Sequence, residues 1–137
     1  ITRRSTDAVI FDSAGFSLSF QNITADRTIT DSRTLFGFSE RFTEHFSLKS
    51  GTWTVWNKDN GQKIDHGATN TGGIQTHGYY PLYLTRERSG NYHMGYFRTS
   101  DAMDVETENF SNDSILKIYR TIGGIIDFRY FIGEKDP

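Results

Sequence analysis

The sequence predicts an all-β fold, because its apolar segments mostly alternate with polar residues, glycine-rich turns separate them, and no window shows a capped helical stripe. Phe16, Leu18 and Phe20, for example, alternate with serines, as in a half-buried strand. The segments expected to form strands cover residues 8–11, 16–20, 52–57, 82–85, 92–98, 115–119 and 125–132. The best helical candidate, residues 39–46, is short and bordered by glycines. Short strands at this spacing, joined by such turns, predict a β-sandwich.

The composition limits what the chain can be. At 137 residues it fits one domain, and its 15% aromatic content means that Phe and Tyr supply much of the core. The net charge of −2, with Lys and Arg scattered, gives no basis for nucleic-acid binding or for an anionic membrane surface. The absence of cysteine excludes disulfides, thiolate metal sites and cysteine nucleophiles. No apolar run approaches the roughly 20 residues of a membrane span, so we expect no membrane insertion.

A long loop rich in Gly, Asp and Asn extends from Asn57 to Gly78, between two expected strands. Loops of this length in a compact domain are usually kept for function. Sugar sites combine aromatic faces with carboxylates and amides, and the loop and its borders hold these residue types: Trp53, Trp56, Asn57, Asp59, Asp65, His66, His77, Tyr79 and Tyr80. Composition alone favours the alternative that the tryptophans belong to the core and the polar residues build turns.

Two pairs of aspartates lie close in the sequence, Asp59 with Asp65 and Asp101 with Asp104. Glycosidases need two carboxyl groups that flank the scissile bond, roughly 5 to 10 Å apart. Neither pair follows a recognisable barrel strand, and spacing within a loop fixes no distance. We therefore assign no catalytic residue to the chain.

The remaining polar residues suggest no further chemistry. The histidines lack the spacing of metal ligands, so we expect no metal and no cofactor; they are His45, His66, His77 and His93. Four charged residues are expected to form a solvated face: Glu40, Arg41, Glu44 and Lys49. Candidate N-glycosylation triplets begin at Asn22, Asn109 and Asn112 and lean toward a secretory route.

Several segments, in order, resemble the N-terminal β-sandwich of family 31 glycoside hydrolases, the α-glucosidase type. They are residues 5–13, 35–42, 54–59, 77–83, 100–105 and 119–133. Residues 119–128, YRTIGGIIDF, are the most specific, being very close to the family's YRTIGGILDF. Three positions depart from the pattern: Ser39 replaces a usual glycine, Tyr80 a common histidine and Asp101 a common asparagine.

The resemblance implies a galactose-mutarotase-like β-supersandwich whose long loop walls the substrate pocket. It implies that Asp59 hydrogen-bonds hydroxyls of the terminal glucose, where a carboxylate accepts charge-assisted bonds. Tyr79 and Tyr80 are expected near the return of the loop. The family's catalytic carboxylates lie in a (β/α)8 barrel outside this chain, so the chain alone is expected to be inactive.

The resemblance also sets the expected partners and location. Ile1 is neither an initiator methionine nor part of a signal peptide, so residues 1–137 are expected to be a partial N-terminal domain, with earlier strands upstream and the barrel downstream. The partners are then the rest of the same enzyme and an α-glucoside, and the location is secretory, lysosomal or extracellular. The alternatives are a non-catalytic carbohydrate-binding or scaffolding domain derived from this family and, last, an unrelated all-β module whose loop binds a protein.

Overall fold

The computed structural model describes residues 1–12, 14, 23–31, 34–42, 46–48, 50–57, 74–111 and 114–134. These residues form ten strands and no helix, which confirms the all-β prediction. The strands are β1 Ile23–Asp31, β2 Thr34–Gly37, β3 Arg41–Phe42, β4 Gly51–Val55, β5 Ile74–Gln75, β6 Leu82–Arg86, β7 Tyr92–Phe97, β8 Met103–Ser111, β9 Ser114–Thr121 and β10 Phe128–Ile132. Across the described residues, no helix is long and apolar enough to span a membrane.

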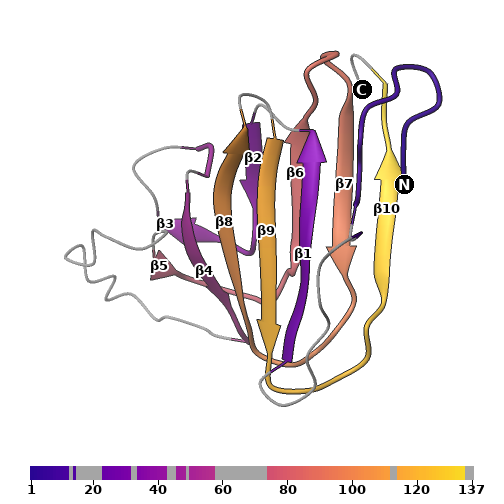
Figure 1. The fold of residues 1–137 in the computed structure, drawn as a ribbon. Helices are drawn as coiled ribbons and strands as arrows, with labels where there is room; N and C mark the ends of the chain where they lie inside the picture. The colour runs from indigo at the N-terminus through magenta and orange to yellow at the C-terminus, as the bar shows by residue number, and fades with distance from the viewer. Residues whose placement is uncertain are drawn as a thin grey trace.

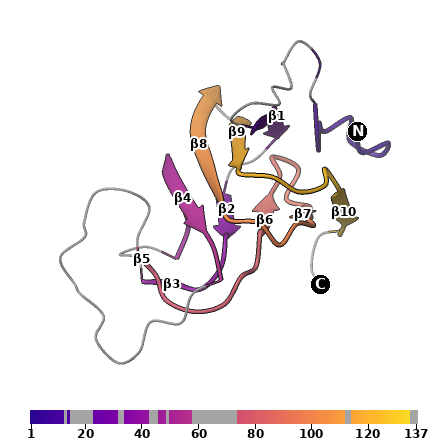
Figure 2. The ribbon, with the colours of Figure 1, turned by 90° about the horizontal axis from the view of Figure 1, so that it is seen from below.

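Two antiparallel four-stranded sheets face each other, as Figures 1 and 2 show. Sheet I has the strand order β1-β9-β8-β4, and sheet II has the order β10-β7-β6-β2. A third sheet of two short strands, β3 and β5, lies beside β4 (Figure 1). This arrangement is the predicted sandwich, with a small sheet added at one side.

The core lies between the two sheets and is largely aromatic. From sheet I, Trp53 and Tyr119 are buried, and the Trp53 indole N–H donates to Thr107 Oγ1 at 2.8 Å. From sheet II, Phe97 is buried and stacks on Phe128 with ring centroids 4.4 Å apart. A buried indole is stable only when its N–H finds a partner, which Thr107 provides.

A group of buried charged residues also lies inside the sandwich. Arg3, from the N-terminal segment, pairs with Glu87 at 2.6 Å, and His93 Nδ1 lies 3.0 Å from the same carboxylate. Lys117 of β9 is fully buried, with its Nζ 4.0 Å from the centre of the Tyr83 ring. Buried charges of this kind are tolerated because they are paired or placed against an aromatic face.

Five of the predicted strands are confirmed as β4, β6, β7, β9 and β10. The apolar run at 8–11 is not part of a strand; it makes an isolated bridge, between Thr2 and Val9, and backbone hydrogen bonds to residues 1–3. Residues 16–20 lie outside the described residues. Strands β1 and β8, which we did not expect, supply most of sheet I together with β9. Between β9 and β10, Gly124 is needed as glycine, because it has φ of +100° and a Cβ there would lie 2.3 Å from Asp101 Oδ2.

Candidate functional site

The two borders of the long loop are hydrogen-bonded to each other, through Gln75 of β5 and Trp56. Residues 58–73, and with them Asp59, Asp65 and His66, lie outside the described residues. We call the described segments around them, residues 38–41, 54–57 and 74–80, the loop root. The pairing of β3 with β5, with Arg41 opposite Gln75, holds these segments in register.

Gln75 joins the two ends of the loop. Its buried side-chain amide donates to Trp56 O at 2.7 Å and to Gly78 O at 2.6 Å. Its Oε1 accepts from the Trp56 N–H at 3.1 Å. One side chain thereby satisfies backbone groups on both sides of the 58–73 segment, which fixes the exit of the chain from β4 and its return.

Ser39 continues this chain of contacts on the other side of the return. Its Oγ accepts from the Tyr80 N–H at 2.9 Å, and its own N–H donates to Tyr80 O at 3.1 Å. Ser39 has φ of +71° and Phe38 has φ of +55°, both in the left-handed region that favours glycine. The turn therefore keeps a conformation that suits the glycine expected at position 39.

Glu40 and His77 form an exposed polar pair at the loop root. Glu40 Oε1 accepts from Thr76 Oγ1 at 2.6 Å and lies 3.0 Å from His77 Nδ1. The hydrogen bond from Thr76, and then that from His77, lowers the pKa of the Glu40 carboxyl. The side chains of His77 and Glu40 are 48% and 64% exposed, so the pair can accept hydrogen bonds from a ligand or donate them to it.

Arg41 corrects one expectation from the sequence. It was expected on a solvated face, but it is half-buried, and its guanidinium donates to Phe38 O at 2.6 Å and to Thr54 O. Burial lowers its pKa to about 10, against the opposing effect of Asp104. Glu40 is exposed as expected, and the other two members of that face lie outside the described residues.

The two tryptophans of the predicted sugar site differ in burial. Trp53 is 4% exposed and belongs to the core, as the alternative interpretation had it. Trp56 is 47% exposed and stands at the start of the loop, next to the exposed Asn57. Of the two tryptophans, only Trp56 therefore offers an aromatic face to a ligand.

Tyr79 and Tyr80 also differ in role. The Tyr79 hydroxyl donates to Asp101 O at 2.6 Å, the ring packs against the core, and burial raises its pKa to about 12. Tyr80 is 56% exposed, with its ring over Gly78, where a Cβ would lie 2.4 Å from a ring carbon. Tyr79 thus supports the loop root, whereas Tyr80 is available to a ligand.

The carboxylates in the described part of the loop's surroundings have structural partners. Asp101 accepts from Thr99 Oγ1 at 3.1 Å, and Asp104 accepts from Thr54 Oγ1 at 2.6 Å. Of the candidate glycosylation sites, Asn109 lies exposed on β8, and Asn22 and Asn112 lie outside the described residues.

The loop root thus presents exposed aromatic and hydrogen-bonding groups, namely Trp56, Asn57, His77, Tyr80 and Glu40. Sequence reasoning missed Gln75, Ser39 and Glu40 as parts of it. A glutamine inside a glycine-rich stretch gives no signal of burial.

Comparison with known proteins relates the whole chain to glucosidases. It is 30% identical over 138 residues to the lysosomal acid α-glucosidase of Tetrahymena pyriformis, covering 100% of this chain and 14% of the relative. It is 35% identical over 141 residues to the intestinal sucrase-isomaltase of Homo sapiens, covering 97% of this chain and 7% of the relative. It is 28% identical over 139 residues to an α-glucosidase of Hordeum vulgare, covering 98% of this chain and 14% of the relative. No family model matches the chain.

A stretch similar to this chain is therefore a recurring part of larger α-glucosidases. The chain is a homologue of one segment of α-glucosidases, which confirms the resemblance to family 31. It spans only 7% to 16% of the length of the curated relatives that it matches. The names of two of these relatives include "lysosomal" and "intestinal".

Proposed function

We propose that residues 1–137 form the β-sandwich of an α-glucosidase that hydrolyses terminal α-linked glucose with retention. The observation that carries the proposal is the match of nearly the whole chain to several glucosidases. The catalytic carboxylates then belong to a barrel elsewhere in the same protein, as in the retaining mechanism of two carboxyl groups. A secretory, lysosomal or extracellular location is part of the proposal.

In this protein the loop rooted at Trp56 and Gly78 walls the substrate pocket. Asp59 contacts the glucose hydroxyls, and the exposed aromatic faces of Trp56 and Tyr80 flank the sugar. The double anchoring of the loop by Gln75 supports this role, because a wall that orients a substrate must be held at both ends. Tyr79 acts on the sugar only indirectly, by holding the return segment through its bond to Asp101.

The test is hydrolysis of maltose by the full-length protein and by its Asp59→Ala variant. Loss of a charge-assisted bond to sugar is expected to lower kcat/KM by about tenfold or more, since such a bond contributes about 1.5–3 kcal/mol. Glu108→Ala is the matched control, because Glu108 is an exposed carboxylate on β8. Its kinetics are expected to equal those of the unmodified protein.

Two results would contradict the proposal in different ways. A full-length protein that binds maltose without hydrolysing it favours the non-catalytic carbohydrate-binding alternative. A full-length protein that hydrolyses maltose equally well with Asp59 and with alanine removes Asp59 from the site, and leaves the loop a structural role.

A further inference from the structure

A row of apolar residues crosses the outer face of sheet II from one edge to the other. Phe36 of β2 is opposite Leu84 of β6, Leu84 is opposite Met94 of β7, and Met94 is opposite Phe131 of β10. Their immediate neighbours along the strands, including Leu35 and Tyr83, belong to the buried core on the inner side. Since side chains alternate between the two faces of a sheet, the row faces away from the sandwich.

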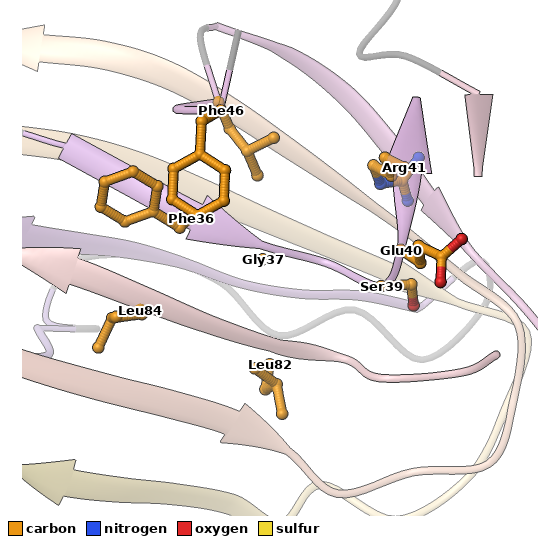
Figure 3. Close-up of a pocket in the computed structure, with 9 residues that line it drawn as sticks. Phe36, Gly37, Ser39, Glu40, Arg41, Phe46, Leu82 and Leu84 are labelled. Carbon is orange, nitrogen blue, oxygen red and sulfur yellow. The ribbon is translucent and has the colours of Figure 1, made fainter. Parts of the chain in front are cut away.

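Two residues of this row are exposed, and Phe36 and Met94 are half-buried. Leu84 is 39% exposed and Phe131 is 51% exposed, while Phe46, whose ring centre lies 5.1 Å from that of Phe36, is 88% exposed. The face is also hollowed on both sides of Leu84. A depression of about 400 Å³ is lined by Phe36, Phe46 and Leu82 among others (Figure 3), and one of about 540 Å³ by Met94, Phe131 and Ile132 among others.

The outward residues of two strands of the opposite sheet are polar instead. On β4 and β8 they are Thr52, Thr54, Asp104, Glu106 and Glu108. Glu106 pairs there with Arg120 at 2.6 Å. An antiparallel sheet can face water on one side when that side is polar, as these two strands are, whereas a contiguous apolar face marks a contact surface.

We propose that the outer face of sheet II, centred on Phe36, Leu84, Met94 and Phe131, is the surface on which polypeptide of the same protein from outside residues 1–137 packs. The occupant presents apolar side chains that fill the two depressions beside Leu84. The inference rests on the proposed function only in treating the chain as part of a longer protein.

The relatives support this choice of occupant over a second copy. In each of them the matching stretch makes up 7% to 16% of the length, so most of the polypeptide lies outside it. A segment of the same chain is held near the face at high effective concentration, which favours it over a separate molecule. The row reaches both edge strands of sheet II, so the contact is broad rather than a single anchor.

The experiment places the photocrosslinking residue p-benzoylphenylalanine at position 84 or 131 of the full-length protein. After irradiation, crosslinked peptides are identified by mass spectrometry. Position 108 is the matched control, because Glu108 is exposed on the polar side of the sandwich. We expect crosslinks within one molecule, from positions 84 and 131 to residues outside 1–137, at several times the yield seen at position 108.

Three results overturn the inference. Crosslinks that join two molecules and increase with protein concentration assign the face to a second copy. Crosslinks confined to residues 1–137 mean that the chain covers its own face. Crosslinking yields at positions 84 and 131 no higher than at position 108 mean that the face is exposed to solvent in the full-length protein. Maltose hydrolysis is measured separately and tests the proposed function. A protein that gives the expected crosslinks but does not hydrolyse maltose would support the contact surface and contradict the proposed function.

Discussion

Ser39 and Tyr80 bind each other through two hydrogen bonds although 41 residues separate them in the chain. The Ser39 hydroxyl accepts from the Tyr80 N–H at 2.9 Å, and the Ser39 N–H donates to Tyr80 O at 3.1 Å. Ser39 makes these bonds from a backbone with φ of +71°. A left-handed residue with a side chain costs about 1–2 kcal/mol, and the hydroxyl bond offsets part of that cost.

Substitution of Ser39 separates the two effects. Ser39→Ala keeps the unfavourable φ and loses the hydroxyl, so we expect a loss of about 1 kcal/mol in the free energy of unfolding. Ser39→Gly also loses the hydroxyl but relieves the backbone, and is expected to be more stable than the alanine variant by about 1 kcal/mol. Hydrogen exchange of the β6 amides in the full-length protein measures both. Equal stability of the two variants would mean that the backbone carries no strain.

Gln75→Met tests the connection between the two ends of the loop. Methionine keeps the length and volume of the side chain but loses all three bonds to Trp56 and Gly78. We expect the loop root to lose about 1–3 kcal/mol, because buried backbone groups are left without partners. The Trp56 amide, which Gln75 Oε1 protects, is expected to exchange much faster, while the Phe97 amide, bonded to Pro81 O, serves as the control. Unchanged exchange at Trp56 would contradict the proposed role of Gln75.

The sequence predicts only part of the site, and the reason is physical. Aromatic and carboxylate residues around the loop are visible in the composition, so Trp56 and Tyr80 were named. The role of Gln75 depends on the position of two backbone segments that meet only when β3 pairs with β5. Those strands have two residues each, too few to show any periodicity.

More of the fold than of the site could be predicted from the sequence. The failure to predict strand β8 has a clear physical cause. Strand β8 buries Met103, Val105 and Thr107 in strict alternation, but its other face carries Asp104 and Glu106, so its mean hydropathy is low. The apolar run at 8–11 shows the reverse case. It has the composition of a strand, but its described pairing is one bridge, between Thr2 and Val9, with backbone hydrogen bonds to residues 1–3.

The two tryptophans are expected to respond very differently to alanine. Trp53→Ala removes a core side chain that is 4% exposed and leaves Thr107 without the indole N–H, so we expect a loss of about 3–5 kcal/mol. Trp56→Ala removes a side chain that is 47% exposed, and is expected to change stability by less than about 1 kcal/mol. Denaturant unfolding followed by the slowest-exchanging amides of β7 and β8 compares them. In the proposed enzyme, the two variants are expected to affect maltose binding in the opposite order. Trp56→Ala raises the KM for maltose, whereas Trp53→Ala leaves the KM of the molecules that remain folded unchanged.

Buried His93 predicts that this part of the protein loses stability in acid. Burial, helped by the charges of Lys117 and Arg3 and opposed by Glu87, lowers the pKa of His93 to about 4. Burial alone raises the pKa of Glu87, but its hydrogen bonds from Arg3 and His93 outweigh that effect and keep this carboxyl ionised. In the unfolded chain, a histidine has a pKa of about 6.5. Between these two values the unfolded state binds a proton at position 93 that the folded state does not.

Stability therefore falls as the pH drops through this window, by about 2 kcal/mol between about pH 7 and pH 5 from His93 alone. The depressed pKa of Glu87 adds a further loss only below the ordinary glutamate range, as that carboxylate becomes protonated. His93→Gln removes the titration while its amide can still donate to Glu87, so its stability is expected to vary much less over the same window. The measurement is the free energy of opening of the β7 and β9 amides in the full-length protein at both pH values, corrected for intrinsic exchange. A pH dependence as steep in the glutamine variant as in the unmodified protein would assign the acid sensitivity to other groups.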